Sequence, residues 1–216
     1  MKKRLNNPQY LGKNLAKYLN RAIALLGFTA VLFAPIELSQ ARVFAEVERA
    51  IVRLLVQNNT DFSTFFSSAQ EKYEKGDFQG AIADYSRAIE LNPNDYHSYM
   101  MRGVIRGNLG DRQGAIADYT KAIEINPTMP YAYINRGAER FFLGDIQGAI
   151  SDYNQAIKID PNEAPNYSNR GQARQNLGDF SGAIADWQKA AELYRQQGNL
   201  EASQDELKKI QSLQQR

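Results

Sequence analysis

One heptapeptide recurs along the chain at a fixed interval and constrains its fold more than any other feature. The pattern Gly-Asp-x-x-Gly-Ala-Ile begins at Gly76, Gly110, Gly144 and Gly178, so the interval from each copy to the next is constant. A fixed period of this length is typical of stacked repeat arrays, in which each unit buries its apolar face against its neighbours. We therefore expect the chain to fold as a solenoid.

Each repeat has the pattern of two helices joined by a tight turn. An apolar stripe of helical period precedes the Gly-Asp step, and a second stripe follows it. Glycine can adopt the left-handed conformation that ends a helix, and the aspartate can cap the next helix by accepting backbone N–H bonds. A proline then ends the second helix, because the residue before proline is pushed out of helical geometry. These prolines, Pro93, Pro127 and Pro161, set the unit boundaries at 62–95, 96–129, 130–163 and 164–197.

Over residues 62–197 the units resemble those of the tetratricopeptide-repeat (TPR) family. A unit of that family has an aromatic residue at positions 4 and 24, a small residue at position 8, and alanine at positions 20 and 27. The matching residues are Phe65, Tyr99, Tyr133 and Tyr167 at position 4, Ala69, Gly103, Gly137 and Gly171 at position 8, and Tyr85, Tyr119, Tyr153 and Trp187 at position 24. The resemblance implies an all-α, right-handed superhelical solenoid of four helix-turn-helix units.

The last segment, residues 198–216, differs from the repeats. Arg195 stands where the earlier units have proline, so the second helix of the fourth unit is expected to continue to Gly198. An apolar stripe follows in an otherwise polar sequence and consists of Leu200, Leu207, Ile210 and Leu213. A solenoid needs a terminal element with a polar outer face, so this segment predicts a capping helix.

Arginine and aspartate recur in phase with the repeat. Positions 7 and 11 of the last three units hold Arg102, Arg106, Arg136, Arg140, Arg170 and Arg174, and position 23 holds Asp84, Asp118, Asp152 and Asp186. We expect these arginines to lay their stems over the helix pair and to bond the aspartates between repeats. A basic stripe that binds an anionic partner is the alternative. The first unit lacks both arginines and is expected to be the atypical end unit.

The N-terminal 41 residues look like an export segment. They hold six of the 26 basic residues and one of the 24 acidic residues, which leaves a mildly acidic body of 20 basic and 23 acidic side chains. An uncharged run, residues 22–36, follows the basic stretch, and Ser39-Gln40-Ala41 offers small residues for cleavage. Residues 1–41 are therefore predicted to be a signal peptide or a membrane anchor, with a buried helix of a soluble domain as the alternative. The basic flank would stay cytoplasmic and place the repeats on the other side, in a periplasm or a thylakoid lumen.

Residues 42–61 are predicted to form an amphipathic helix and a linker. Apolar residues from Val43 to Leu55 are spaced by one, three and four, which indicates a helix over 42–57 that packs on the first repeat. A partner-binding or membrane-surface helix is the alternative. Asn58-Asn59-Thr60-Asp61 is expected to break the helix and to cap the next one.

The sequence offers no recognisable catalytic or metal-binding set. The chain has no cysteine and one histidine, His97, without neighbouring ligands, so no metal or cofactor is expected. The repeated Asp-Tyr and Asp-Trp pairs occur at the same phase of every unit, whereas an active site is a single convergence of groups. The acidic body lacks the concentrated basic field that nucleic-acid binding requires. We therefore expect a protein that is neither an enzyme nor a nucleic-acid binder.

In TPR arrays the first helices of the units line a concave groove. Carried over by position, the resemblance places these candidate peptide-binding residues in the groove: Phe66, Gln70, Tyr73, His97, Met100, Val104, Tyr131, Ile134, Phe141 and Gln172. The family members that hold a C-terminal carboxylate use basic residues at positions where this chain has Phe66, Gln70, Tyr131 and Asn135. Binding of chaperone tails is therefore not expected.

These observations predict a non-catalytic interaction scaffold that binds a helical or extended peptide in the groove. A role in assembling a membrane complex, like that of TPR proteins in bacterial envelopes and photosynthetic membranes, fits the export segment and is what the family resemblance implies. The alternative is a structural, self-associating protein whose groove holds its own helix 42–57 or another copy.

Overall fold

The computed structural model describes residues 38–215. The expected export segment, with its apolar run 22–36, thus lies outside the described residues except for residues 38–41. The chain divides into two compact units, Met1–Leu54 and Leu55–Arg216, which are considered separately. None of the helices in residues 38–215 combines the length and the apolar character that a bilayer span requires.

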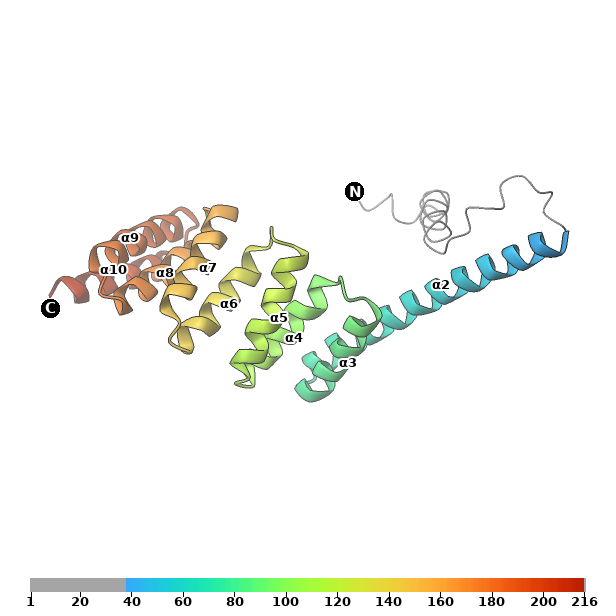
Figure 1. Ribbon diagram of the computed structural model, residues 1–216. Helices are drawn as coiled ribbons and strands as arrows, with labels where there is room; N and C mark the ends of the chain where they lie inside the picture. The colour runs from blue at the N-terminus through green and yellow to red at the C-terminus, as the bar shows by residue number, and fades with distance from the viewer. Residues whose placement is uncertain (1–37, 216) are drawn as a thin grey trace. The chain divides into compact units, whose positions relative to one another are not determined.

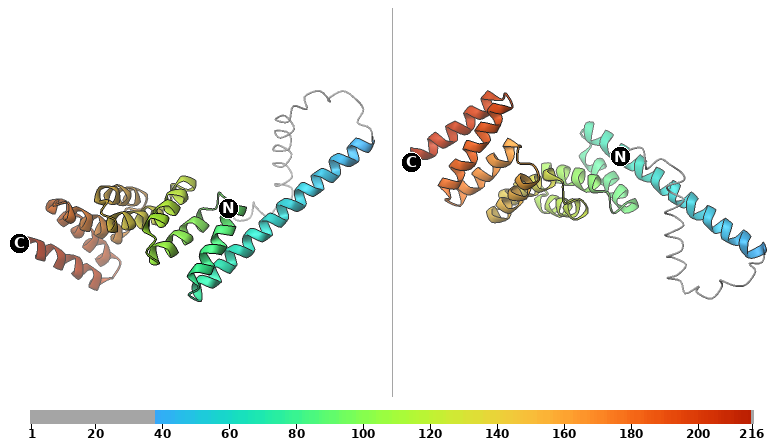
Figure 2. Two further views of the ribbon diagram at one scale, coloured as in Figure 1. Left: turned by 60° about the horizontal axis from the view of Figure 1, so that its bottom comes forward. Right: turned by 90° about the horizontal axis from the view of Figure 1, so that it is seen from above.

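The described residues form helices joined by short turns. In chain order these helices are α2 (Leu38–Glu74), α3 (Phe78–Leu91), α4 (Tyr96–Asn108), α5 (Arg112–Ile125), α6 (Pro130–Phe142), α7 (Ile146–Ile159), α8 (Ala164–Asn176), α9 (Phe180–Gln196) and α10 (Leu200–Gln214). From α3 to α10 each helix packs against the next, and the pairs α4/α5, α6/α7 and α8/α9 follow one another in chain order (Figures 1 and 2). The expected all-α solenoid with a C-terminal capping helix is therefore confirmed.

The recurring heptapeptide ends one helix and starts the next. Its first glycine has a positive φ, for example 79° at Gly76, and Asp77 then caps α3 by accepting a 2.9 Å hydrogen bond from the Gly80 backbone N–H. A Cβ at the second glycine, Gly80, would collide with Oδ2 of Asp77, so a larger residue there would have to displace the capping carboxylate.

Small residues at position 8 let the two helices of a repeat approach each other. A Cβ added at Gly137 would lie 2.9 Å from Cε1 of Tyr153, which is closer than packed carbon atoms approach. A Cβ added at Gly103 would likewise lie 2.8 Å from Cε1 of Tyr119. The aromatic ring at position 24 thus fills the space that the glycine leaves, and this contact forms the core of each repeat.

The predicted break at Asn58–Asp61 is wrong, because α2 continues through these residues to Glu74. Their polar side chains bond groups one turn away in the same helix: Thr60 Oγ1 donates to the carbonyl of Val56 at 3.0 Å, and Gln57 Nε2 donates to Asp61 Oδ1 at 2.9 Å. Polar side chains can therefore be satisfied inside a helix as well as at its start.

The capping helix α10 presents a different face from the one that the apolar pattern predicted. Ile210 and Leu213 are buried as expected, but Leu200 and Leu207 are 61% and 47% exposed. Ser203 and Glu206 are buried in their place. Ser203 Oγ donates to the carbonyl of Ala191 at 2.8 Å, so hydrogen bonding to α9 contributes to the rotation of this helix.

Candidate functional site

The predicted groove residues lie on the first helix of each repeat, namely the C-terminal part of α2 and the helices α4, α6 and α8. Helix α4 contacts α6, and α6 contacts α8, so the first helices of successive repeats are neighbours. We call the surface that these helices form around the predicted groove residues the first-helix face. It is an extended surface, and two depressions of the described residues lie elsewhere, one lined by Glu48, Arg49, Val52 and Arg53 and the other by Asp61, Phe65, Arg87, Glu90 and Leu91.

The ten residues differ in exposure. Gln70, His97 and Tyr131 are exposed, and Tyr131 presents 58% of its surface to solvent. The half-buried residues are Phe66, Tyr73, Val104, Ile134, Phe141 and Gln172. Met100 is buried at 8% exposure in a cluster with Ala115, Tyr119 and Ala132, so the structure places it in the core and not on the face. Position 5 of the second repeat therefore supports helix packing, contrary to its predicted contact with a ligand.

Two of the half-buried aromatic residues are held by the core. The ring of Phe66 meets Tyr85 edge to face, with centroids 5.7 Å apart, and Phe141 packs against the cluster of Ala149, Tyr153 and Ala173. Such contacts fix the orientation of a ring before any ligand arrives. Part of the first-helix face is therefore preorganised.

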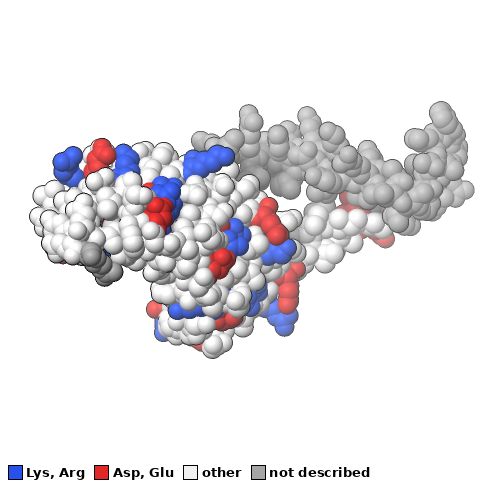
Figure 3. Space-filling view, turned by 60° about the vertical axis from the view of Figure 1, so that its left-hand side comes forward, with Lys and Arg blue, Asp and Glu red and all other residues white. Residues whose placement is uncertain are grey.

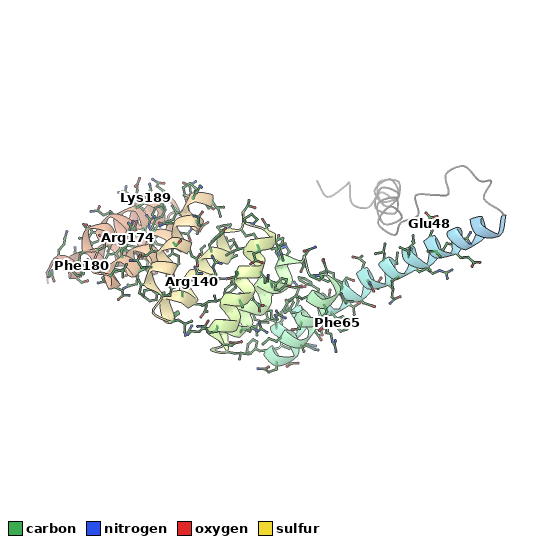
Figure 4. All side chains as sticks on the ribbon, in the orientation of Figure 1. Glu48, Phe65, Arg140, Arg174, Phe180 and Lys189 are labelled. Carbon is green, nitrogen blue, oxygen red and sulfur yellow. The ribbon has the colours of Figure 1, made fainter. Side chains whose placement is uncertain are left out.

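The arginines and aspartates form the predicted bonds, but within each repeat and not between repeats. Arg136 donates to both carboxylate oxygens of Asp152, at 3.0 and 2.7 Å, and Arg140 donates to Oδ2 of Asp152 at 2.8 Å. Arg102 and Arg106 bond Asp118 in the same way, and Arg170 and Arg174 bond Asp186. Arg140 and Arg174 lie at equivalent places on α6 and α8 (Figure 4). These arginines are committed to the fold, which argues against a basic stripe for an anionic partner.

A third hydrogen bond of the position 7 arginine makes the link between repeats. Arg136 Nη1 donates to Thr120 Oγ1 of the preceding repeat at 3.1 Å, and Arg170 Nη1 donates to Asn154 Oδ1 at 2.7 Å. Each of these arginines also lies over the ring of the position 4 tyrosine of its own repeat. The guanidinium carbon of Arg136, for example, lies 5.8 Å from the ring centroid of Tyr133.

The first repeat keeps this arrangement with different residues. Ser68 and Lys72 donate to Oδ2 of Asp84, the latter at 2.7 Å. Burial raises the pKa of the Asp84 carboxyl, but the hydrogen bonds from Lys72 and Ser68 outweigh burial and hold the pKa below its ordinary value. The aspartate at position 23 is therefore an anchor in all four units.

Helix α10 adds residues that the sequence analysis did not place next to the face. Ser168 of α8 donates to Oε1 of Glu206 at 2.7 Å, and Lys209 Nζ bonds both Ser168 Oγ and Glu206 Oε1, at 3.1 and 2.9 Å. Glu206 and Lys209 lie one repeat length after Gln172 and Gln175 of the fourth unit. Extending the repeat numbering into the capping helix would have identified them.

No group of three or more possible metal ligands gathers within residues 38–215. Burial raises the pKa values of Tyr85, Tyr119 and Tyr153, and the pKa of Tyr85 reaches about 12. Charge on the surface is mixed: in the view of Figure 3, basic and acidic side chains lie beside one another with uncharged surface between them.

Comparisons with known proteins support the description of the chain as a repeat array. A model of the TPR repeat matches residues 69–110 and 139–178, and a second tetratricopeptide-repeat model matches residues 96–129. A comparison with curated protein sequences found no match.

Solved structures resemble the chain over most of its length. A crystal structure of MamA protein is 22% identical, with a TM-score of 0.60 over 73% of this chain and 93% of that one. MamA from Desulfovibrio magneticus RS-1, residues 41 to the end, is 17% identical, with a TM-score of 0.59 over 72% and 96%. The first TPR of Spaghetti (RPAP3), bound to the HSP90 peptide SRMEEVD, is 22% identical, with a TM-score of 0.53 over 55% and 94%. At these identities the likeness shows a shared fold, and the chain is an all-α solenoid built of tetratricopeptide repeats.

Proposed function

We propose that this protein is a non-catalytic interaction scaffold that binds a helical or extended peptide along the first-helix face. The observation that carries the proposal is the exposure of Tyr131, which presents 58% of its surface beside the half-buried Ile134 on the same helix. Exposed aromatic residues next to partly buried apolar residues act as anchor sites for the apolar side chains of a peptide.

The kind of peptide follows from the residues on the face. The similar RPAP3 domain was solved with an acidic HSP90 peptide. In this chain the residues that correspond to the basic clamp of chaperone-tail binders are Phe66, Gln70, Tyr131 and Asn135. They carry no positive charge, so the proposal is for apolar anchoring and not for a carboxylate clamp.

We also propose that the repeats act on the non-cytoplasmic side of a membrane, in the assembly of a membrane or envelope complex. The support is the basic stretch followed by the uncharged run 22–36 in the sequence. N-terminal sequencing of the protein recovered from membrane and non-membrane fractions tests this part. Loss of residues 1–41 supports a signal peptide, retention in the membrane fraction supports an anchor, and retention in a cytoplasmic fraction contradicts export.

Photo-crosslinking tests the scaffold proposal directly. A photoreactive amino acid at position 134 should capture a heterologous protein, and Tyr131→Ala should reduce that capture. The matched control places the same probe at Gln113, an exposed residue of the second helix α5. Equal capture from both positions would contradict binding at the first-helix face.

Self-association is the second candidate, and one observation favours it. In the N-terminal part of α2, Val47, Leu54, Leu55 and Val56 are between 49% and 62% exposed. Apolar side chains repeated along one helix are typical of a surface that packs against another chain. Crosslinks from position 134 that contain only a second copy of this chain would favour this candidate over the binding of a heterologous peptide.

A further inference from the structure

The first helices of the last three repeats present no uncommitted charge. All Lys, Arg, Asp and Glu side chains of α4, α6 and α8 are paired with a residue of opposite sign, and these side chains are Arg102, Arg106, Arg136, Glu139, Arg140, Arg170 and Arg174. The pairing distances run from 2.6 Å for Arg102 with Asp118 to 2.9 Å for Arg174 with Asp186.

The pairs that the position 7 arginines form are also withdrawn from solvent. The side chain of Asp118 is 3% exposed and that of Arg102 is 14% exposed, and Asp152 and Arg136 are 3% and 13% exposed. Arg102 cannot turn toward a ligand without leaving a buried aspartate without this partner, which is unfavourable. These arginine–aspartate pairs therefore offer no counter-charge to a partner that lies on the first-helix face.

The groups that remain on the face are apolar or neutral and polar. Tyr131 is exposed, Val104 and Ile134 are half-buried, and four half-buried amide side chains accompany them: Asn135, Asn169, Gln172 and Gln175. A carboxamide both donates and accepts hydrogen bonds, as a peptide backbone does. Such a surface can satisfy an uncharged segment completely, whereas a charged side chain placed on it would lose its water and find no ion partner.

The C-terminal end of the face is neutral for a separate reason. Glu206 is 4% exposed, and its Oε1 accepts from Lys209 at 2.9 Å, so the charges of α10 that meet α8 neutralise each other. The ammonium of Lys209 also bonds Ser168, which ties it to the fold. The neutral region thus extends from α4 to α10.

From this charge pattern we infer that the part of the first-helix face on α4, α6 and α8 selects an uncharged segment with apolar anchors and neutral polar residues between them, and that it discriminates against acidic and basic tails. The inference rests on the proposed function, because it names the partner chemistry of the same surface. Charge complementarity decides it: a neutral surface favours a neutral occupant, and the affinity depends little on salt because no exposed ion pair forms.

Panning a displayed library of random peptides of about 12 residues on the immobilised full-length chain tests the inference. The expected pool is depleted in Asp, Glu, Lys and Arg relative to the input and is lost with Tyr131→Ala. The strongest peptide should change its Kd by less than about twofold between about 0.05 and 0.5 M salt. A pool rich in acidic or basic residues that still needs Tyr131 would overturn the inference and leave the proposed function standing. Failure to enrich any peptide would overturn both.

A charge introduced on the face provides the matched comparison. Gln172→Lys should move the selected pool toward acidic peptides and make their binding at least about fivefold weaker at high salt. Gln113→Lys, the same change at an exposed residue of the second helix α5, should leave the neutral pool unchanged. A pool that ignores Gln172→Lys would show that charge on this face does not govern selection, and would overturn the inference.

Discussion

Arg112 at the start of α5 donates a 2.6 Å hydrogen bond to Oε2 of Glu139 on α6, and this ion pair joins the second repeat to the third. The Glu139 side chain is only 13% exposed. The Arg112 guanidinium also lies 4.4 Å from the ring centroid of Phe142. A Cβ at Gly107 would lie 2.5 Å from Oε1 of Glu139, so the glycine makes room for the carboxylate.

The equivalent places in two other junctions are apolar. Phe78 packs on the cluster that contains Ile105, and Ile146 packs on the cluster that contains Ala173. Arg112 stands one repeat length after Phe78, and Glu139 stands one repeat length after Ile105. The second and third repeats are therefore joined by a charged pair where the other junctions use hydrophobic contact.

Breaking this pair should cost more than replacing it. Arg112→Ala leaves Glu139 mostly buried without its partner, so we expect the free energy of unfolding to fall by about 2–4 kcal/mol, with allowance for the partial exposure of the arginine. The double variant Arg112→Phe with Glu139→Ile has the same residue types that the first junction has at Phe78 and Ile105. Its free energy of unfolding should lie within about 1 kcal/mol of that of the natural protein. Urea denaturation of the single and double variants checks this, and additive losses would contradict the proposed coupling.

The buried arginine–aspartate pairs should contribute far more to the free energy of unfolding than an exposed ion pair does. Arg136→Met removes two bonds to Asp152 and one to Thr120, and we expect a loss of about 3 kcal/mol. Arg87→Met is the matched control, because Arg87 pairs with Glu90 while both side chains are more than 60% exposed, and it should cost less than about 1 kcal/mol. Thermal and chemical unfolding measure the stability of both variants. Equal losses would show that the buried arginine–aspartate pairs stabilise the fold no more than an exposed ion pair.

Whether alanine in place of the second glycine raises or lowers the free energy of unfolding should depend on the capping aspartate. Gly148→Ala forces a Cβ into the carboxylate of Asp145 and disturbs the cap, so it should destabilise by about 1 kcal/mol although alanine favours helix. When Asp145→Ala is already present, the carboxylate is gone and the same glycine change should stabilise by up to about 1 kcal/mol. A double-mutant cycle by urea denaturation measures this reversal, and the same sign in both backgrounds would refute the explanation.

Tyrosine ionisation should weaken the fold at alkaline pH. Burial, followed by the charges of Tyr73 and Asp95, raises the pKa of Tyr85 from 10.0 to about 12. Between these values the unfolded chain has released a proton that the folded chain keeps, so the free energy of unfolding falls as pH rises. Tyr85→Phe should reduce this slope by up to about 1.4 kcal/mol per pH unit.

The same variant should cost little at neutral pH, because the buried Tyr85 hydroxyl has no hydrogen-bond partner within residues 38–215. Urea titrations at a series of pH values measure both effects. The slope should not vanish, because Tyr119 and Tyr153 have raised pKa values too. An unchanged slope in Tyr85→Phe would mean that this hydroxyl titrates normally in the folded chain.

Several features were predictable because they repeat. The interval from Gly76 to Gly110 predicted helix pairs, and the phase of Arg136 and Asp152 predicted their bond. Both follow from local rules: a glycine and an aspartate act on the turn they occupy, and residues at equal phase meet equal neighbours in every unit. Whether that bond lies within or between repeats depends on helix packing, which the phase alone does not contain.

Other features depend on how neighbouring elements meet. Met100 has the same repeat position as Phe66, yet it is buried, and Leu207 is exposed while Glu206 beside it is buried. The repeat, the helix pairs and the capping aspartates follow from the amino-acid sequence alone, because they depend on contacts within a few turns of chain. Tertiary packing settles which members of the predicted face remain accessible and which charges are neutralised. Burial depends on side chains from adjacent repeats and from α10, and the apolar spacing did not predict the rotation of that helix.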